Sequence, residues 1–165
     1  MDITKKFDIS MPHYGKSDCS PELARNFTGF KISAPEIVVL SEKREIAICG
    51  AYQLSNTVSI LFGNNLTEET VVVFTNKESG TEFSFNLVPP GKHYLVEPEK
   101  KDIPRDRPEL LTENILKAGS TIIGTYFNID AFMFKKDFPV EEAIYAVYAK
   151  NYNLKSNTVT IKIRI

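Results

Sequence analysis

Residues 158–165, at the C-terminal end of the chain, alternate strictly between polar and apolar side chains. The apolar set is Val159, Ile161, Ile163 and Ile165, and the polar set is Thr158, Thr160, Lys162 and Arg164. A period of two places one set on each face of an extended strand, which predicts a strand with one dry and one wet face. Because Ile165 is in phase and is the final residue, we expect this end of the chain to be held in a sheet.

Similar strand patterns recur from about residue 27 onward and are separated by turn residues. The runs are residues 45–54, 58–62, 70–75, 81–88, 94–96, 121–129 and 141–150. Residues 76–80, Asn-Lys-Glu-Ser-Gly, have the length and composition of a hairpin loop between two of these runs. Phe132 and Phe134 continue the apolar alternation of the 121–129 run, so we expect strand character to extend through them.

One short helix is predicted at residues 108–117. Pro108 suits the first turn of a helix, Glu109 complements the helix dipole, and Gly119 can close the C-terminal end. The remaining connections are too short for crossover helices, which argues against a doubly wound parallel sheet. The pattern therefore predicts an all-β fold, an antiparallel β-sandwich formed by a single domain at residues 26–165. Residues 1–25 have weak periodicity, and we expect them to form an irregular N-terminal arm laid over the sandwich.

The C-terminal part of the sequence resembles an immunoglobulin-like sandwich. The resemblance rests on the tyrosine-rich run at 145–149, Tyr-Ala-Val-Tyr-Ala, followed by Ser156, Asn157 and a terminal strand of valine and isoleucine. Antibody-type domains carry a buried tryptophan between paired cysteines, whereas this chain has no tryptophan. The resemblance therefore implies an immunoglobulin-like architecture and no particular family.

The charge balance and the lengths of the apolar runs exclude two classes of partner. The chain has 20 basic and 21 acidic residues and a formal net charge of -1, whereas a nucleic-acid-binding protein normally carries a basic excess. The longest apolar runs are about four residues, far below the roughly 20 that a membrane-spanning helix needs. We expect neither nucleic-acid binding nor a membrane span. Residues 1–10 lack the apolar stretch of a secretory signal, which favours a cytoplasmic location and leaves export by another route open.

Two cysteines, Cys19 and Cys49, permit one disulfide without requiring it. The missing export signal favours two free thiols, although the Asn-x-Thr triplets at 26–28 and 65–67 would suit a secreted glycoprotein. At a mid-strand position Cys49 is expected to behave as a small apolar residue. It shares its face of the 45–54 run with alanines, so we expect another segment to pack closely against that face.

Catalysis and metal binding have weak candidates. A cysteine nucleophile needs a base, and His13 and Asp18 lie near Cys19 in the sequence, but such partners usually converge from distant segments. His13 and His93 are far apart and no Cys-x-x-Cys pair occurs, so no zinc site is expected. Calcium could use acidic residues near the predicted helix, namely Glu97, Glu99, Asp102, Asp106 and Glu109. Interleaved basic residues favour a self-paired, solvated loop instead, so we predict no metal, no cofactor and no catalytic residues.

The best candidates for a binding site follow the 141–150 run. Tyrosine supplies rigid contact area and asparagine supplies adaptable hydrogen bonds, which is the composition of a recognition surface. The candidate residues are Tyr148, Asn151, Tyr152 and Asn153. The leading hypothesis is a non-catalytic β-sandwich that binds a protein partner or a second copy of itself. The alternatives are a carbohydrate-binding sandwich, with or without calcium, which the lack of tryptophan disfavours, and a thiol-dependent enzyme.

Overall fold

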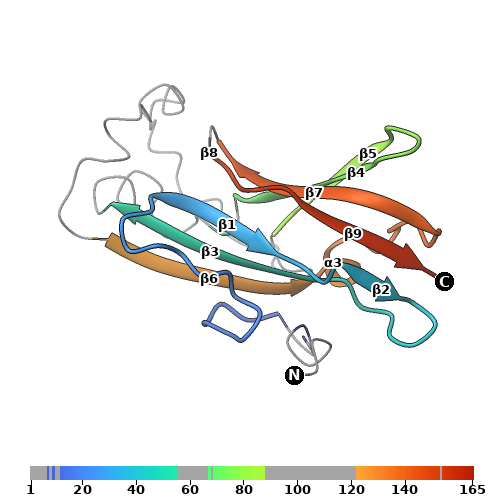
Figure 1. Ribbon diagram of the computed structural model, residues 1–165, viewed down its shortest axis with the longest axis horizontal. Helices are drawn as coiled ribbons and strands as arrows, with labels where there is room; N and C mark the ends of the chain where they lie inside the picture. Colours follow the sequence, from blue (N-terminus) through green and yellow to red (C-terminus); the bar gives the residue numbers. More distant parts are fainter. Residues whose placement is uncertain are drawn as a thin grey trace, which may run out of the picture.

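The computed structural model describes residues 7, 9, 12–55, 67, 69–87, 122–152 and 154–165. Within these ranges the chain forms nine strands in two sheets and one short helix, which confirms the prediction of an all-β fold (Figure 1). The strands of the first sheet are β1 (Gly29–Ser33), β3 (Ala47–Ser55) and β6 (Ile122–Asp130), in the order β1-β3-β6. The second sheet contains β2 (Ile37–Val39), β4 (Val71–Asn76), β5 (Glu82–Asn86), β7 (Ala143–Asn151), β8 (Leu154–Lys155) and β9 (Val159–Arg164). Its order is β2-β9-β7-β4-β5, with β8 paired to β7.

The first sheet is antiparallel and centred on β3, as the alternation at 45–54 and 121–129 predicts. Gly50 of β3 lies opposite Phe127 of β6. A Cβ atom at Gly50 would lie 2.0 Å from the Phe127 ring, so the ring occupies the space that any other residue would need. The glycine is therefore required for the close approach of this aromatic side chain.

The second sheet contains the predicted hairpin between β4 and β5, which is confirmed. The Asn76 carboxamide oxygen accepts hydrogen bonds from the backbone N–H groups of Glu78 (2.9 Å) and Ser79 (3.2 Å) and so shapes the loop. Gly80 has φ 71°, a left-handed conformation that glycine adopts readily. The loop composition read from the sequence thus corresponds to the backbone conformations that the turn needs.

One strand pair departs from the predicted antiparallel arrangement. β2 runs parallel to β9, with Ile37 opposite Lys162 and Val39 opposite Arg164. The chain leaves the first sheet after β1 and crosses to the second sheet through residues 34–36, so β2 arrives in the same direction as β9. The C-terminal strand is in the sheet as expected up to Arg164, whereas Ile165 lies beyond β9 and is 61% exposed.

Both sheets contribute side chains to one hydrophobic cluster. The first sheet supplies Phe30, Ile32, Ile48, Tyr52, Leu54, Phe127 and Ile129, and the second supplies Val72, Phe74, Phe85, Tyr145, Val147, Ala149, Ile161 and Ile163. Phe74 contacts Phe83 (ring centroids 5.3 Å apart), Phe138 (5.1 Å) and Tyr145 (5.9 Å) in an aromatic group at one end of the cluster. The period-two alternation therefore does bury one face of each sheet in a shared core.

The helix α3 (Ala131–Phe134) replaces the strand predicted through Phe132 and Phe134. Asp130, the last residue of β6, has an extended conformation and its side chain accepts a hydrogen bond from the Phe132 N–H. This is the arrangement of a helix N-cap, which starts a helix where the alternation of phenylalanines would continue a strand.

Several predicted features lie outside the described residues: the helix at 108–117, the strands at 58–62 and 94–96, and the charged loop at 97–107. Within the described part of the chain, no helix is long and apolar enough to cross a membrane.

Candidate functional site

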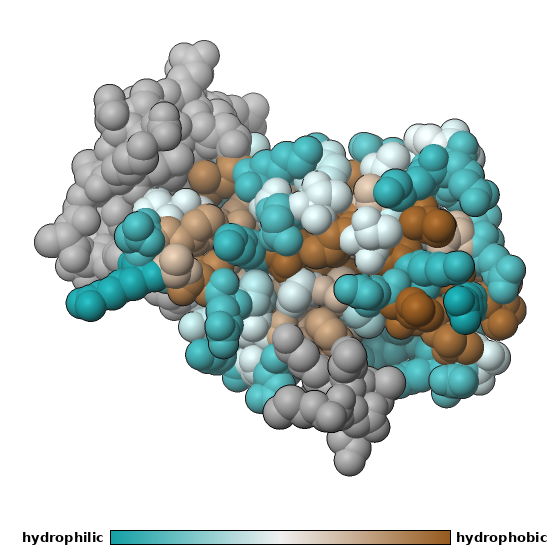
Figure 2. Space-filling model, viewed as in Figure 1, coloured by the Kyte–Doolittle hydropathy of each residue, from teal (hydrophilic) through white to brown (hydrophobic). Residues whose placement is uncertain are grey.

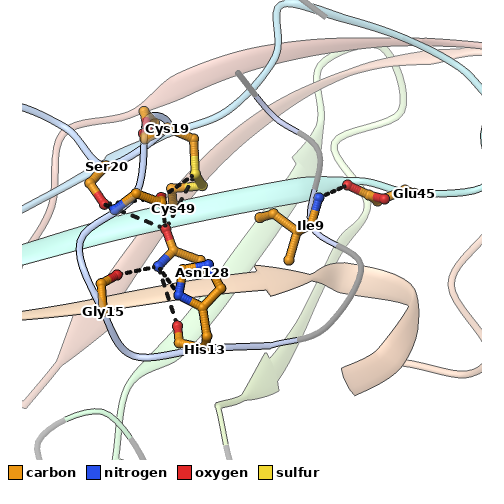
Figure 3. The surroundings of a disulfide bond; sticks show 10 residues. Ile9, His13, Gly15, Cys19, Ser20, Glu45, Cys49 and Asn128 are labelled. Carbon is orange, nitrogen blue, oxygen red and sulfur yellow. Dashed lines mark hydrogen bonds between the residues drawn. A yellow bond between two sulfur atoms is a disulfide. The ribbon is translucent and has the colours of Figure 1, made fainter. Parts of the chain in front are cut away.

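A disulfide joins Cys19 to Cys49 of β3, with the two Cα atoms 5.9 Å apart (Figure 3). The prediction of two free thiols is therefore wrong. The predicted close packing on the small-residue face of β3 is confirmed, since Ile9 and Cys19 form a buried cluster there with Ala47 and Cys49. A sulfur held in a disulfide is no nucleophile, so this state gives no support to thiol chemistry.

Asn128 of β6 anchors the N-terminal segment that carries Cys19 (Figure 3). Its buried side chain donates a hydrogen bond to the Gly15 carbonyl (2.7 Å) and accepts one from the Ser17 hydroxyl (2.6 Å). Its backbone exchanges two hydrogen bonds with His13, at 3.0 and 2.9 Å. His13 therefore bonds to the side of β6 that faces away from β3, and segment 13–20 is fixed to the first sheet.

Two of the predicted recognition residues, Asn151 and Tyr152, lie where β7 ends and the chain turns toward β8. Asn151 pairs with Leu154, and Tyr152 lies in the connection between them; Asn153 is outside the described residues. Tyr152 is 52% exposed and has φ 51°. Asn151 is 1% exposed, and its amide donates a hydrogen bond to the Thr70 hydroxyl at 3.1 Å. The structure thus presents Tyr152 at the surface and uses Asn151 to hold the turn from beneath.

The support of this turn extends into the other sheet. The Thr70 hydroxyl that accepts from Asn151 is also hydrogen-bonded to the hydroxyl of Tyr52 on β3. Burial raises the pKa of Tyr52, while its hydrogen bonds to Thr70 and Asn151 act in the opposite direction. Tyr52 therefore stays a neutral phenol. Its hydrogen bond to Thr70, together with the bond from Asn151 to Thr70, links the end of β7 to the first sheet inside the core.

Tyr148 lies on the outer face of the second sheet, opposite Val73 of β4. The Lys155 ammonium lies 4.0 Å from the centroid of the Tyr148 ring, a cation–π geometry. Sequence reasoning missed Lys155. Pairing Asn151 with Leu154 in a tight hairpin would have revealed this lysine. That pairing places Lys155 opposite Lys150, on the same face of the sheet as Tyr148.

In the described ranges no three histidine, cysteine, aspartate or glutamate side chains are grouped so that they could hold a metal ion. Comparisons of the chain with models of known protein families, with curated proteins and with solved structures find no match.

Proposed function

We propose that this chain is a non-catalytic recognition protein with an immunoglobulin-like sandwich architecture, and that it binds another protein through the tip of the β7–β8 hairpin. The strand order supports the architecture. In variable-type immunoglobulin domains the strands G, F, C and C′ share a sheet, and β9-β7-β4-β5 are adjacent in the same manner. The order β1-β3-β6 fits the strands A, B and E of the opposite sheet.

The observation that carries the functional proposal is the conformation and exposure of Tyr152. A non-glycine residue in the left-handed region costs about 1–2 kcal/mol, and two-residue hairpins favour asparagine or glycine at such positions. The chain therefore has an exposed tyrosine where glycine would fit the backbone better. Strain of this kind points to a functional role for the side chain.

The surroundings of Tyr152 suit a protein partner. The buried Asn151 and Leu154 fix the turn on both sides, so the exposed ring is presented with little conformational freedom to lose on binding. Lys150 and Lys155 are exposed on the neighbouring strand ends. We propose a partner surface with an apolar contact for the ring and acidic groups for the two lysines.

Carbohydrate binding is the weaker interpretation of the same surface. Sugar rings stack on an open aromatic face, whereas one face of Tyr148 is covered by the Lys155 ammonium.

The test is site-specific photo-crosslinking in an extract of the native host. A benzophenone amino acid replaces Tyr152 in one variant and Tyr14 in a matched control, because Tyr14 is also an exposed tyrosine, at 45%. We expect one discrete protein adduct from position 152, none from position 14, and a weaker adduct when Lys150→Glu and Lys155→Glu are added. The proposal fails if position 152 gives no protein adduct while a glycan array binds the wild type and not Tyr152→Gly.

A further inference from the structure

The edge of β9 that faces away from β7 is only partly paired. β2 covers Lys162, Ile163 and Arg164, and the Lys162 N–H donates to the Glu36 carbonyl at 2.8 Å. Backbone groups alternate in direction along a strand, so the N–H and C=O of Thr160 point the same way as those of Lys162. Within the described ranges no strand pairs with β9 at Thr160 on that side. Thr160 thus offers one donor and one acceptor on an open edge.

A groove of about 600 Å³ lies along this open edge. Its lining is Ile32, Ser33, Ala34, Glu36, Ile37, Ile144, Val159, Thr160 and Lys162. In Figure 2 hydrophobic residues gather at the end of the molecule where Figure 1 places β2 and the C-terminal half of β9. Ile37, one of the lining residues of the groove, is 53% exposed.

Two polar connections fix the ends of the groove. At one end the Asn157 side chain accepts from the Ile32 N–H (2.8 Å) and donates to the Ile32 carbonyl (3.0 Å). At the other end is the hydrogen bond between Lys162 and Glu36. Hydrogen bonds therefore hold β1, β2 and β9 in place around the groove.

The chemistry of the groove identifies its occupant. A backbone donor and acceptor on a strand edge are matched by another extended backbone. The charged lining residues, Glu36 and Lys162, have opposite sign and lie at the same end of the groove, so the rest of the wall complements an uncharged side chain. We propose that this groove binds a short extended segment of another protein by strand addition to β9 at Thr160.

The register predicts the pattern of the bound segment. Paired residues on adjacent strands point to the same face, and Val159 packs against the core cluster while Thr160 is exposed. In the bound segment, the residue opposite Val159 therefore points toward Ile32 and Ala34, and the residues before and after it point outward. We expect an aliphatic residue at that central position. The proposal is independent of the Tyr152 tip, and either can fail alone.

The test begins with a phage library of random dodecapeptides selected on the wild-type protein. The affinities of the selected synthetic peptides are then measured for the wild type, Thr160→Pro and Thr160→Val. Proline removes the N–H that would bond the peptide but leaves the N–H groups that pair with β7, and valine retains the N–H as the matched control. We expect Thr160→Val to bind as the wild type does and Thr160→Pro to bind roughly tenfold more weakly, the effect of losing about one hydrogen bond.

A second variant makes the result independent of the folding of Thr160→Pro. Ala34→Leu fills the groove from the β1 side without changing β9, and it should abolish peptide binding. Tyr152→Gly should leave peptide affinity unchanged, which separates this groove from the hairpin tip. A library that yields no binder, or binders that tolerate both Thr160→Pro and Ala34→Leu, would overturn the proposal.

Discussion

Asp130 carries a carboxylate at the point where β6 turns into α3. One of its oxygens accepts hydrogen bonds from the backbone N–H groups of Ile46 (2.9 Å) and Phe132 (3.2 Å). Burial raises the pKa of this carboxyl, and the nearby charge of Glu45 raises it further. The two N–H groups and Lys43 lower it, but the net shift of the pKa is upward. The residue therefore serves as an acceptor and has to tolerate a partly desolvated charge.

Substitutions at Asp130 separate the effect of its hydrogen-bond acceptor from the effect of its charge. A carboxyl whose pKa rises on folding stabilises the fold while it is protonated, below the ordinary pKa of 3.8, and that contribution is lost as pH rises through the raised value. Asp130→Asn keeps an oxygen acceptor and cannot titrate. We expect its free energy of unfolding, relative to the wild type, to increase across this pH window and then stay constant, as measured by urea unfolding at a series of pH values.

Asp130→Ala is the companion variant, because it removes the acceptor as well as the charge. It should lower the free energy of unfolding by about 1–3 kcal/mol at neutral pH, since it removes the helix cap and leaves two backbone donors without their acceptor. Equal pH dependence of Asp130→Asn and the wild type would refute the assignment of the charge penalty to this residue.

The left-handed backbone of Tyr152 gives a second prediction at this scale. Glycine adopts φ 51° without steric cost, whereas a β-branched residue is the least suited to it. We expect Tyr152→Gly to leave the free energy of unfolding unchanged or to raise it by up to about 1 kcal/mol, and Tyr152→Val to lower it by about 1–2 kcal/mol. Chemical denaturation measures both, and a valine variant as stable as the glycine variant would show that the turn is not strained.

At the scale of elements, the N-terminal segment is fastened to the first sheet by a covalent bond and by Asn128. The disulfide closes a loop with a sequence separation of 30, which corresponds to roughly 3–4 kcal/mol of stabilisation in the loop-entropy treatment. We expect Cys19→Ser with Cys49→Ala to lower the free energy of unfolding by that amount and to speed hydrogen exchange at the His13 and Asn128 amides. Dithiothreitol should destabilise the wild type similarly and leave the double variant unaffected. If the amides stay fully protected in the double variant, Asn128 alone holds the segment.

The elements that sequence predicts well are those whose signal is local. The alternation in β3, β7 and β9 and the loop at 76–80 each lie within one stretch of chain, and the structure has them where they are expected. The alternation of Phe132 and Phe134 misleads because the cap formed by Asp130 decides the conformation there. The direction of β2 depends on which sheet the chain joins after β1, and a three-residue strand carries no local signal for that choice.

The candidate site shows the same division between local and distant information. The position of Tyr152 in a connection follows from the polar interruption between two strand patterns, whereas the short strand β8 does not. The burial of Asn151 does not, because its partner Thr70 is 81 positions away in the sequence. The disulfide was missed because the prediction of free thiols rested on an inference about the compartment, whereas pairing depends on which strand face Cys19 covers.

At the scale of the whole molecule, polar groups of the described residues join the two sheets at two places in addition to their shared core. Asn157, next to β9, is hydrogen-bonded to Ile32 of β1. Thr70, next to β4, is hydrogen-bonded to Tyr52 of β3 and to Asn151 of β7. The Thr70 hydroxyl is buried, so it fixes how the two sheets pack, because a shift of one sheet would break its hydrogen bond to Tyr52 inside the core.

Thr70 therefore tests whether the two sheets depend on each other. Thr70→Val keeps the shape of the side chain and removes the hydroxyl that Tyr52 and Asn151 contact, so we expect a loss of about 1–3 kcal/mol in the free energy of unfolding. Thr75→Val is the matched control, because its hydroxyl bonds only to the exposed Glu82 side chain, at 3.3 Å, and the change should stay within about 0.5 kcal/mol. Urea denaturation followed by tyrosine fluorescence compares the two variants. Equal losses would mean that the buried hydroxyl contributes no more to stability than a surface one.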